Sequence, residues 1–322
     1  MDERTSFGVG SEPETISVRR IGAFLAAEVT GVDLSRPLEP AQVEAIAQAH
    51  AEHGVLAFPD QKISSDDLKR FGGYFGELTV HPFSTSTEEV PELIIFDNKE
   101  DNPAPPTDIW HSDETFRECP PMGTVLCCKI IPEVGGDTAF ASMTAIHEAL
   151  SDRMQSLLSG LEAVHDFLPF KNLFPDTPEG RKKLHEYEEI YPKPTHPVVQ
   201  LHPVTGKKAL FVNPQFTIRI KGMAEDESRA ILDLLFRKTL RHEFHYRHQW
   251  RPNMVVFWDN RLVQHSALHD YYPHRRLMER VTIKGERPIG DGPPADPSEI
   301  RRHVMPPIIE YSQTRQKRQH EL

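Results

Sequence analysis

Residues 254–265 have the sequence MVVFWDNRLVQH, in which an apolar run, Met254–Trp258, ends in a tight turn followed by His265. A short apolar run bounded by turn residues is typical of a buried strand. Similar runs alternate with turns from Trp110 onward: Thr124–Ile131, Thr138–Ser142, Val198–Leu201, Ala209–Asn213 and Arg280–Lys284. Their spacing predicts an antiparallel sandwich or barrel.

Helical patterns precede and interrupt these strands. The predicted helices are Leu38–His53, Ser64 or Ser65 to Phe75, Met143–Leu158 in two pieces, Pro178–Ile190 and Glu225–Thr239. Further short strands are predicted at Ile16–Arg19, Val55–Phe58 and Leu93–Phe96. The fold class expected is therefore mainly β with α additions.

The length of 322 residues allows two domains or one large β domain with decorations. Residues 1–16 have the character of a loose N-terminal tail, and 290–322 are rich in proline and charge without core-forming periodicity. We expect one domain over 17–289, with 290–322 as a C-terminal tail or an arm that packs on the surface or on a partner subunit.

Charge narrows the class of partner. The chain has 37 Lys and Arg against 48 Asp and Glu, a net charge of −11. This balance argues against a nucleic-acid partner or an anionic membrane surface, both of which need basic patches. A small anionic substrate remains compatible, because a local pair of arginines can override the global balance.

Cysteine usage and hydropathy indicate the compartment. Cys119, Cys127 and Cys128 are too few and too crowded for a disulfide framework, so we interpret all three as packing residues in a reducing cytoplasm. No apolar run approaches the ~18 residues of a membrane span. Met1–Thr15 contains acidic residues and no apolar stretch, which is unlike a signal peptide.

The pair His111 and Asp113 has the spacing of a metal site. Residues i and i+2 of a strand project to the same face, and two His with one carboxylate on one face of an octahedron leave three positions for cosubstrate and dioxygen at iron(II). His50 and Glu52 share the spacing but lie in a predicted helix, where i and i+2 diverge. His-x-Asp alone is a weak signal, and a turn whose side chains bond the backbone is the alternative. His265 beyond the strand and turn supplies a third ligand.

Arg276 and Arg280 lie 11 and 15 residues beyond His265 in the sequence. With a period of two, Arg276, Met278, Arg280 and Thr282 share one strand face. Two guanidinium groups inside a barrel would each require an anion, and guanidinium binds carboxylates in a bidentate manner. The alternative is that both arginines face solvent, as surface arginines usually do.

These residues together resemble the taurine dioxygenase family of iron(II)- and 2-oxoglutarate-dependent oxygenases, which includes aryloxyalkanoate and alkylsulfate dioxygenases. The resemblance runs from about Val18 to Pro288. It is carried by WHSDETF at 110–116, GGDT at 135–138, LFVN at 210–213, WDNR at 258–261 with Gln264 and His265, and RRLM at 275–278 with Arg280. It implies a double-stranded β-helix (jelly-roll) core flanked by helices.

The resemblance also implies roles for single residues. By position, His111, Asp113 and His265 match the iron ligands. Thr138 and Arg276 match the hydroxyl and the arginine that bind the distal carboxylate of 2-oxoglutarate. The residues that match the pocket of the primary substrate are Arg280 for its acidic group, His81 for a sulfonate, and Phe216 for an aromatic wall.

Three departures from the taurine enzyme fall in the same pocket. Ser84 stands where that enzyme has Tyr, Thr107 replaces an Asn, and Glu114 follows the metal Asp in place of a small apolar residue. They predict a substrate other than taurine. Glu114 either faces a cationic group of a zwitterionic substrate or, as is more usual for a loop carboxylate, is solvated.

The expected reaction uses iron(II), 2-oxoglutarate and dioxygen. It hydroxylates a small anionic substrate (an organosulfonate, sulfate ester or carboxylic acid) and releases succinate and CO2, with C–S or C–O cleavage where the oxidised carbon bears a heteroatom group. A homo-oligomer, dimer or tetramer, is expected. Two alternatives are a zinc-dependent hydrolase with the same three ligands, in which Arg276 and Arg280 would lack a purpose, and a non-catalytic 2-oxoglutarate-binding sensor.

Overall fold

The computed structural model describes residues 16–83, 86–87, 90–102 and 107–293. Ser84 and nearly all of the two predicted tails lie outside these residues, so the predicted limits of the domain stay predictions. Within the described part, no helix is long and apolar enough to cross a membrane.

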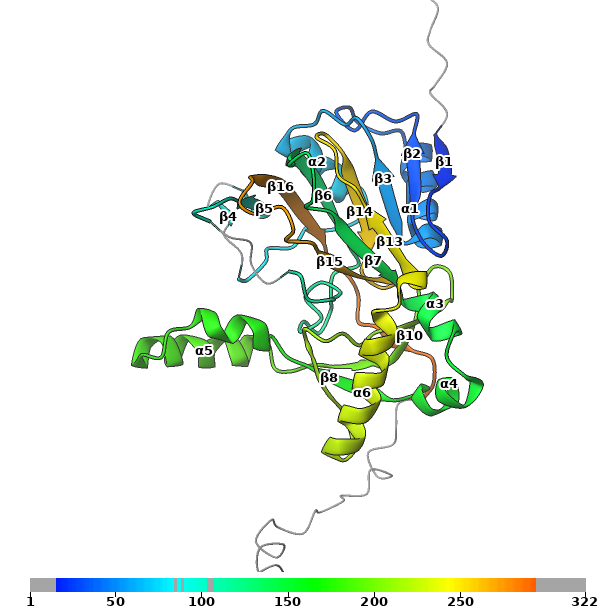
Figure 1. Cartoon of the computed structure of the whole chain (residues 1–322), viewed down its shortest axis with the longest axis vertical. Helices are drawn as coiled ribbons and strands as arrows, with labels where there is room; N and C mark the ends of the chain where they lie inside the picture. Colours follow the sequence, from blue (N-terminus) through cyan, green and yellow to red (C-terminus); the bar gives the residue numbers. More distant parts are fainter. Residues whose placement is uncertain (1–15, 84–85, 88–89, 103–106, 294–322) are drawn as a thin grey trace, which may run out of the picture.

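The core is a sandwich of two sheets (Figure 1). The larger, eight-stranded sheet has the order β1 (Ser17–Arg20), β2 (Ala27–Thr30), β3 (Val55–Phe58), β14 (Val255–Asp259), β6 (Gly123–Ile130), β16 (Arg276–Ile283), β5 (Val90–Asn98), β4 (Ser86–Thr87). The smaller sheet has the order β13 (His245–His248), β7 (Thr138–Ser142), β15 (Val263–Ala267). Phe140 and Val263 of the smaller sheet share one apolar cluster with Leu126, Trp258 and Met278 of the larger. This is the predicted mainly β, jelly-roll architecture.

Two helices cover the outer face of the larger sheet. Helix α1 (Pro40–His53) begins with a capping box between Glu39 and Gln42 and ends at Gly54, whose φ of 69° stops the helix. Helix α2 (Ser65–Gly73) is capped by Ser64, whose side chain accepts a hydrogen bond from the Asp67 N–H. Their apolar faces pack on the strands in a second cluster, and this leaves the inner face of the sheet to the site.

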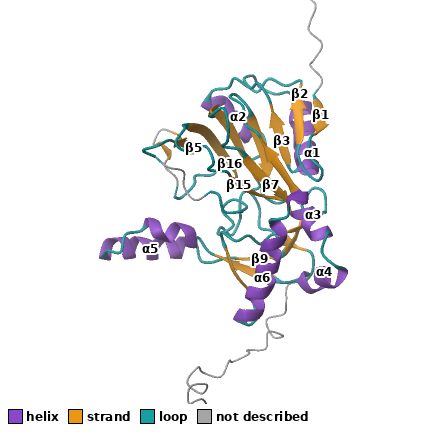
Figure 2. Cartoon of the chain, viewed as in Figure 1, coloured by secondary structure: helices purple, strands orange, loops and turns teal. Residues whose placement is uncertain are grey.

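The remaining elements gather at one end of the sandwich (Figures 1 and 2). Two small sheets have the orders β12 (Thr217–Ile220), β8 (Glu162–His165), β9 (Thr195–Pro197) and β11 (Lys208–Leu210), β10 (Val199–Leu201), β17 (Ile289–Gly290). The helices here are α3 (Met143–Glu148), α4 (Asp152–Leu158), α5 (Pro178–Ile190) and α6 (Glu225–Thr239), with short 3-10 helices at Leu168–Leu173 and His242–Phe244. Helix α5 projects away from the rest (Figure 1).

Most predicted elements are confirmed, and the differences have simple causes. Strand β15 was not predicted, because its central residues Gln264, His265 and Ser266 are polar although buried. Cys127 and Cys128 are buried as expected, and burial raises the pKa of their thiols to about 11 and about 12. The interpretation of Cys119 as a packing residue is wrong, because its side chain is exposed.

Candidate active site

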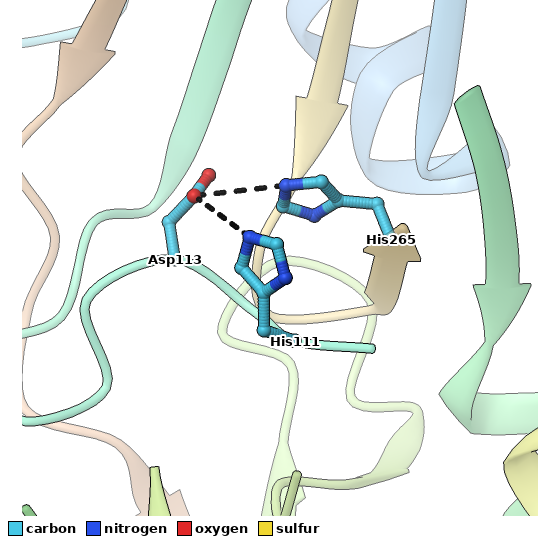
Figure 3. A group of neighbouring side chains, drawn as sticks. All are labelled: His111, Asp113 and His265. Carbon is cyan, nitrogen blue, oxygen red and sulfur yellow. Dashed lines mark ion pairs between the residues drawn. The ribbon is translucent and has the colours of Figure 1, made fainter. Parts of the chain in front are cut away.

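Three predicted ligands meet between the two sheets. His265 lies in β15, and His111 forms an isolated antiparallel bridge with it: the His111 N–H donates to the His265 carbonyl at 3.0 Å, and the His265 N–H donates back at 2.8 Å. Asp113 lies in the turn that follows, so the expectation that a strand carries both His111 and Asp113 is wrong. The turn achieves the same convergence (Figure 3).

The ligand atoms are spaced for one metal ion. Oδ1 of Asp113 lies 3.8 Å from Nε2 of His111 and 3.6 Å from Nε2 of His265. One potential ligand atom from each residue lies within 4.8 Å of the others. Atoms that bind one ion at about 2.0–2.2 Å lie about 3–4 Å apart, so the residues fit a single iron(II) held by two His and one carboxylate.

Neighbouring groups orient the ligands. Nδ1 of His111 lies 2.6 Å from the Ile109 carbonyl, an acceptor only, so Nδ1 carries the proton and Nε2 is left for the ion. The Thr124 hydroxyl donates to Oδ2 of Asp113 at 2.7 Å, and the Asp113 N–H donates to Oδ1 of Asn260 at 3.2 Å. Nδ2 of Asn260 donates to Thr124 at 3.1 Å, which closes the network around the carboxylate.

The electrostatics suit metal ligation. Burial lowers the pKa of both His111 and His265, so their rings are neutral donors at pH 7. Burial by itself would raise the pKa of Asp113, but Arg280 and the two imidazoles hold it well below its ordinary value. Each ligand is therefore in the protonation state that metal binding requires.

Arg276 offers a buried cation. Its side chain is 5% exposed, its Nε donates to the Gly136 carbonyl at 3.1 Å, and its guanidinium lies 5.9 Å from the centre of the Tyr271 ring. Among the described residues no carboxylate lies within 4.0 Å of its nitrogens. A buried, uncompensated guanidinium calls for an anionic ligand.

Gly136 makes room for this arginine. Its φ is +74°, and a Cβ there would lie 2.9 Å from Cδ1 of Ile131 and 3.3 Å from Cδ of Arg276. Two residues on, the Thr138 hydroxyl accepts from the Trp250 indole N–H at 3.0 Å, so its own proton is free to be donated. The GGDT motif thus supplies the Thr138 hydroxyl and brings the Gly136 backbone into close contact with Arg276 of β16.

Arg280 lies next to the metal ligands. It is 8% exposed, so the alternative in which both arginines face solvent is wrong. Nη2 of Arg280 lies 3.0 Å from Oδ1 of Asp113 and 4.0 Å from Oε1 of Glu114. Glu114 is 2% exposed, which overturns its interpretation as a solvated loop residue, and its Oε2 accepts from Nε of Arg117 at 2.6 Å.

Phe216 contacts His111, and His81 is linked to Phe216 through the ring of Phe170. The Phe216 ring lies edge-on to His111 with 6.4 Å between centroids, and the His81 ring lies 5.7 Å from Phe170, which is 6.0 Å from Phe216. Thr107 lies at the end of β15: its carbonyl accepts from the Ala267 N–H, and its hydroxyl is 3.2 Å from Nε2 of His269.

Comparison with known proteins identifies the family of this chain. The family model described as "Taurine catabolism dioxygenase TauD, TfdA family" matches residues 17–282. The chain belongs to this family. It is a dioxygenase, and iron(II), 2-oxoglutarate and dioxygen are the cofactor and cosubstrates of this chemistry, as predicted.

Three similar proteins illustrate the range of the TauD, TfdA family. An "Alpha-ketoglutarate-dependent sulfate ester dioxygenase" of Pseudomonas putida is 32% identical over 85% of this chain and 91% of its own length. An "Alpha-ketoglutarate-dependent 2,4-dichlorophenoxyacetate dioxygenase" of Cupriavidus pinatubonensis is 30% identical over 80% and 94%. The crystal structure of a taurine dioxygenase from Burkholderia xenovorans has a TM-score of 0.72, with 32% identity over 86% of this chain and 91% of that one.

Sequence reasoning missed several residues of the site. Asn260 was within the quoted WDNR motif but had no role assigned, and Thr124 and Arg117 carried no signal. Thr124 is 11 residues from Asp113 in the chain and Asn260 is 147, so only the pairing of β6 with β14 brings them together. Arg117 is within the same loop as Glu114, but a spacing of three in a turn predicts no contact by itself.

Proposed function

We propose that this dioxygenase hydroxylates a small anionic organic compound, namely an organosulfonate, sulfate ester or carboxylic acid, and releases succinate and CO2. The observation that carries the proposal is the pair of buried arginines on one face of β16. Arg280 lies beside the triad, and Arg276 has no carboxylate partner within the described part of the chain. Two anion sites beside one metal site suit a reaction with two anionic reactants, 2-oxoglutarate and the primary substrate.

Each residue has a proposed role. His111, Asp113 and His265 hold iron(II), which when bound supplies the dioxygen activation that couples 2-oxoglutarate decarboxylation to substrate oxidation. Arg276 and the Thr138 hydroxyl bind the distal carboxylate of 2-oxoglutarate and fix its position. Bidentate binding by a preorganised guanidinium limits the motion of the cosubstrate.

The pocket for the primary substrate is proposed on the side of the triad opposite to the 2-oxoglutarate site. Arg280 binds the acidic group, His81 and Phe216 form walls, and Glu114 and Thr107 border the pocket. Burial lowers the pKa of His81, so its ring is a neutral partner at pH 7. The similar proteins are named for a sulfate ester, an aryloxyacetate and taurine, and these share one acidic group on a small organic frame.

The experiment is a substrate screen. Sulfonates, alkyl sulfates, aryloxyacids and amino acids are tested for stimulation of succinate release by the iron(II)-loaded enzyme in air. Anaerobic addition of 2-oxoglutarate should give a visible charge-transfer band, which a zinc hydrolase would lack. Ligand binding without oxygen-dependent succinate would instead support a sensor.

We further propose that residues 17–289 form the catalytic domain, that the protein is cytoplasmic and that it assembles as a dimer or tetramer. The free, partly buried cysteines support a reducing compartment. Size-exclusion chromatography with light scattering tests the assembly.

A further inference from the structure

A ladder of alternating charges extends outward from the metal ligands. Asp113 is followed by Arg280, then Glu114, then Arg117, with closest N–O separations of 3.0, 4.0 and 2.6 Å. Arg117 completes the ladder by donating from Nη2 to the Val80 carbonyl at 2.8 Å and by lying 5.6 Å from the centre of the Tyr191 ring.

We propose that Glu114 is a specificity-determining residue: its buried carboxylate offsets one of the two guanidinium charges, so that the substrate pocket accepts a monoanion and discriminates against a dianion. This inference rests on the proposed function and deepens it, because it specifies the net charge of the anionic substrate.

Both oxygens of Glu114 are directed at guanidinium groups. Oε2 accepts from Arg117 at 2.6 Å, while Oε1 has no hydrogen-bond partner among the residues that the structure describes and lies 4.0 Å from Nη2 of Arg280. Glu114 is held there at some cost, because its φ is +47°, a left-handed conformation that is unusual for a residue other than glycine. The position of this buried carboxylate is therefore fixed by its contacts within the protein.

The local charge then counts as follows. If Asp113 is assigned to the metal, the described residues on the pocket side include two cations, Arg280 and Arg117, and one anion, Glu114, a net of one positive charge. His81 adds none near neutral pH, because burial lowers the pKa of its ring. A bound monoanion neutralises the pocket, whereas a dianion would leave a buried excess negative charge, which is costly in a medium of low dielectric constant.

The same geometry disfavours the zwitterion interpretation of Glu114. A substrate ammonium group near Oε1 would have to approach between the guanidiniums of Arg280 and Arg117, both within 4.0 Å of the carboxylate. Like charges at such distances repel strongly when buried. Glu114 therefore acts on the substrate through the charge of Arg280 and not by binding a substrate cation.

The test measures ligand charge preference without turnover. Protein loaded with Mn(II) and 2-oxoglutarate is titrated by calorimetry at pH 8 with hexyl sulfate, a monoanion, and hexyl phosphate, a dianion. The variants are Glu114→Gln, the charge-restoring double variant Glu114→Gln/Arg117→Gln, and the matched control Glu118→Gln, whose parent side chain is exposed and paired with Arg287. A second pair of probes, propanesulfonate and 3-aminopropanesulfonate, differs only by an ammonium group.

Wild type should prefer the sulfate. One charge about 6 Å from the ligand, at an effective dielectric constant of about 20, changes affinity by roughly 100-fold per ligand charge before screening. Glu114→Gln should therefore shift the phosphate-to-sulfate affinity ratio toward phosphate by at least about tenfold. The double variant should return toward the wild-type ratio, and Glu118→Gln should not differ from wild type.

Four results would overturn the inference. An unchanged ratio in Glu114→Gln refutes the charge role, as does a shifted ratio that the double variant fails to restore. A loss in Glu114→Gln confined to 3-aminopropanesulfonate would show that Glu114 binds a substrate cation. If wild type binds neither hexyl sulfate nor propanesulfonate, the proposed substrate class is wrong and the inference falls with it, which is distinct from failure of the Glu114 role alone.

Discussion

Replacement of Arg276 by Met should separate cosubstrate binding from folding. Arg276 is 5% exposed, and the structure provides one hydrogen bond to it, from Nε to the Gly136 carbonyl, together with the Tyr271 ring. Since no described carboxylate pairs with it, its buried charge is a cost to the folded protein until an anion binds. Met has similar length and no charge, so Arg276→Met removes the anion site with little change in packing.

The expected change in the KM for 2-oxoglutarate follows from the proposed pairing of Arg276 with the distal carboxylate of that cosubstrate. Loss of one partner of a buried, hydrogen-bonded charge pair costs about 2–5 kcal/mol, and each ~1.4 kcal/mol is tenfold in affinity. The KM for 2-oxoglutarate should rise at least about 30-fold. The free energy of unfolding without 2-oxoglutarate should fall by no more than about 1 kcal/mol, because the lost hydrogen bond is offset by the removal of a buried charge.

The assay combines succinate release over a range of 2-oxoglutarate concentrations with urea unfolding of metal-loaded protein. The control is Arg275→Met, in which the neighbouring, exposed arginine loses only its ion pair with Asp97. That variant should keep the wild-type KM and unfold at nearly the wild-type urea midpoint, because exposed ion pairs contribute little to stability. An unchanged KM in Arg276→Met, or equal effects in the two variants, would refute the reasoning.

Three further predictions concern the metal and the buried histidines. His265→Ala should abolish iron(II) binding and turnover, and wild-type metal content in that variant would contradict the ligand assignment. Thr124→Val removes the hydroxyl that donates to Asp113 at 2.7 Å and should weaken metal affinity about 10–100-fold, measured by competition with a chelator; an unchanged affinity would show that the hydroxyl does not orient the carboxylate. Burial lowers the pKa of His50 and His196 to about 4, so the unfolded chain, with a pKa near 6.5, binds more protons between these values. Their stabilising effect is complete above about pH 6.5 and should decrease as the pH falls toward 4, by about 2 kcal/mol each between pH 7 and pH 5; equal urea midpoints at pH 7 and pH 5 would contradict it.

Local pattern was sufficient for most of the elements. Helices α5 and α6 have the bounds predicted, because caps, breakers and apolar spacing are properties of adjacent residues. The same holds for the inward face of β16, since a period of two within one strand already places Arg276 and Arg280 together. Strand β15 escaped prediction because its polar residues are buried by the site and not by an apolar core.

The sequence by itself indicated the candidate metal ligands and the two candidate anion-binding arginines, because residue type and the period of a strand are local properties. The class of chemistry came from the resemblance to the family, which is carried by short motifs of adjacent residues. Tertiary structure decided what surrounds them. The contacts of Thr124 and Asn260 with Asp113 depend on which strands pair, at separations of 11 and 147 residues. The burial of Glu114 between Arg280 and Arg117 depends on how a loop packs against β16. These contacts have no local periodicity in the sequence, and the charge balance of the proposed substrate pocket therefore becomes visible only in the folded chain.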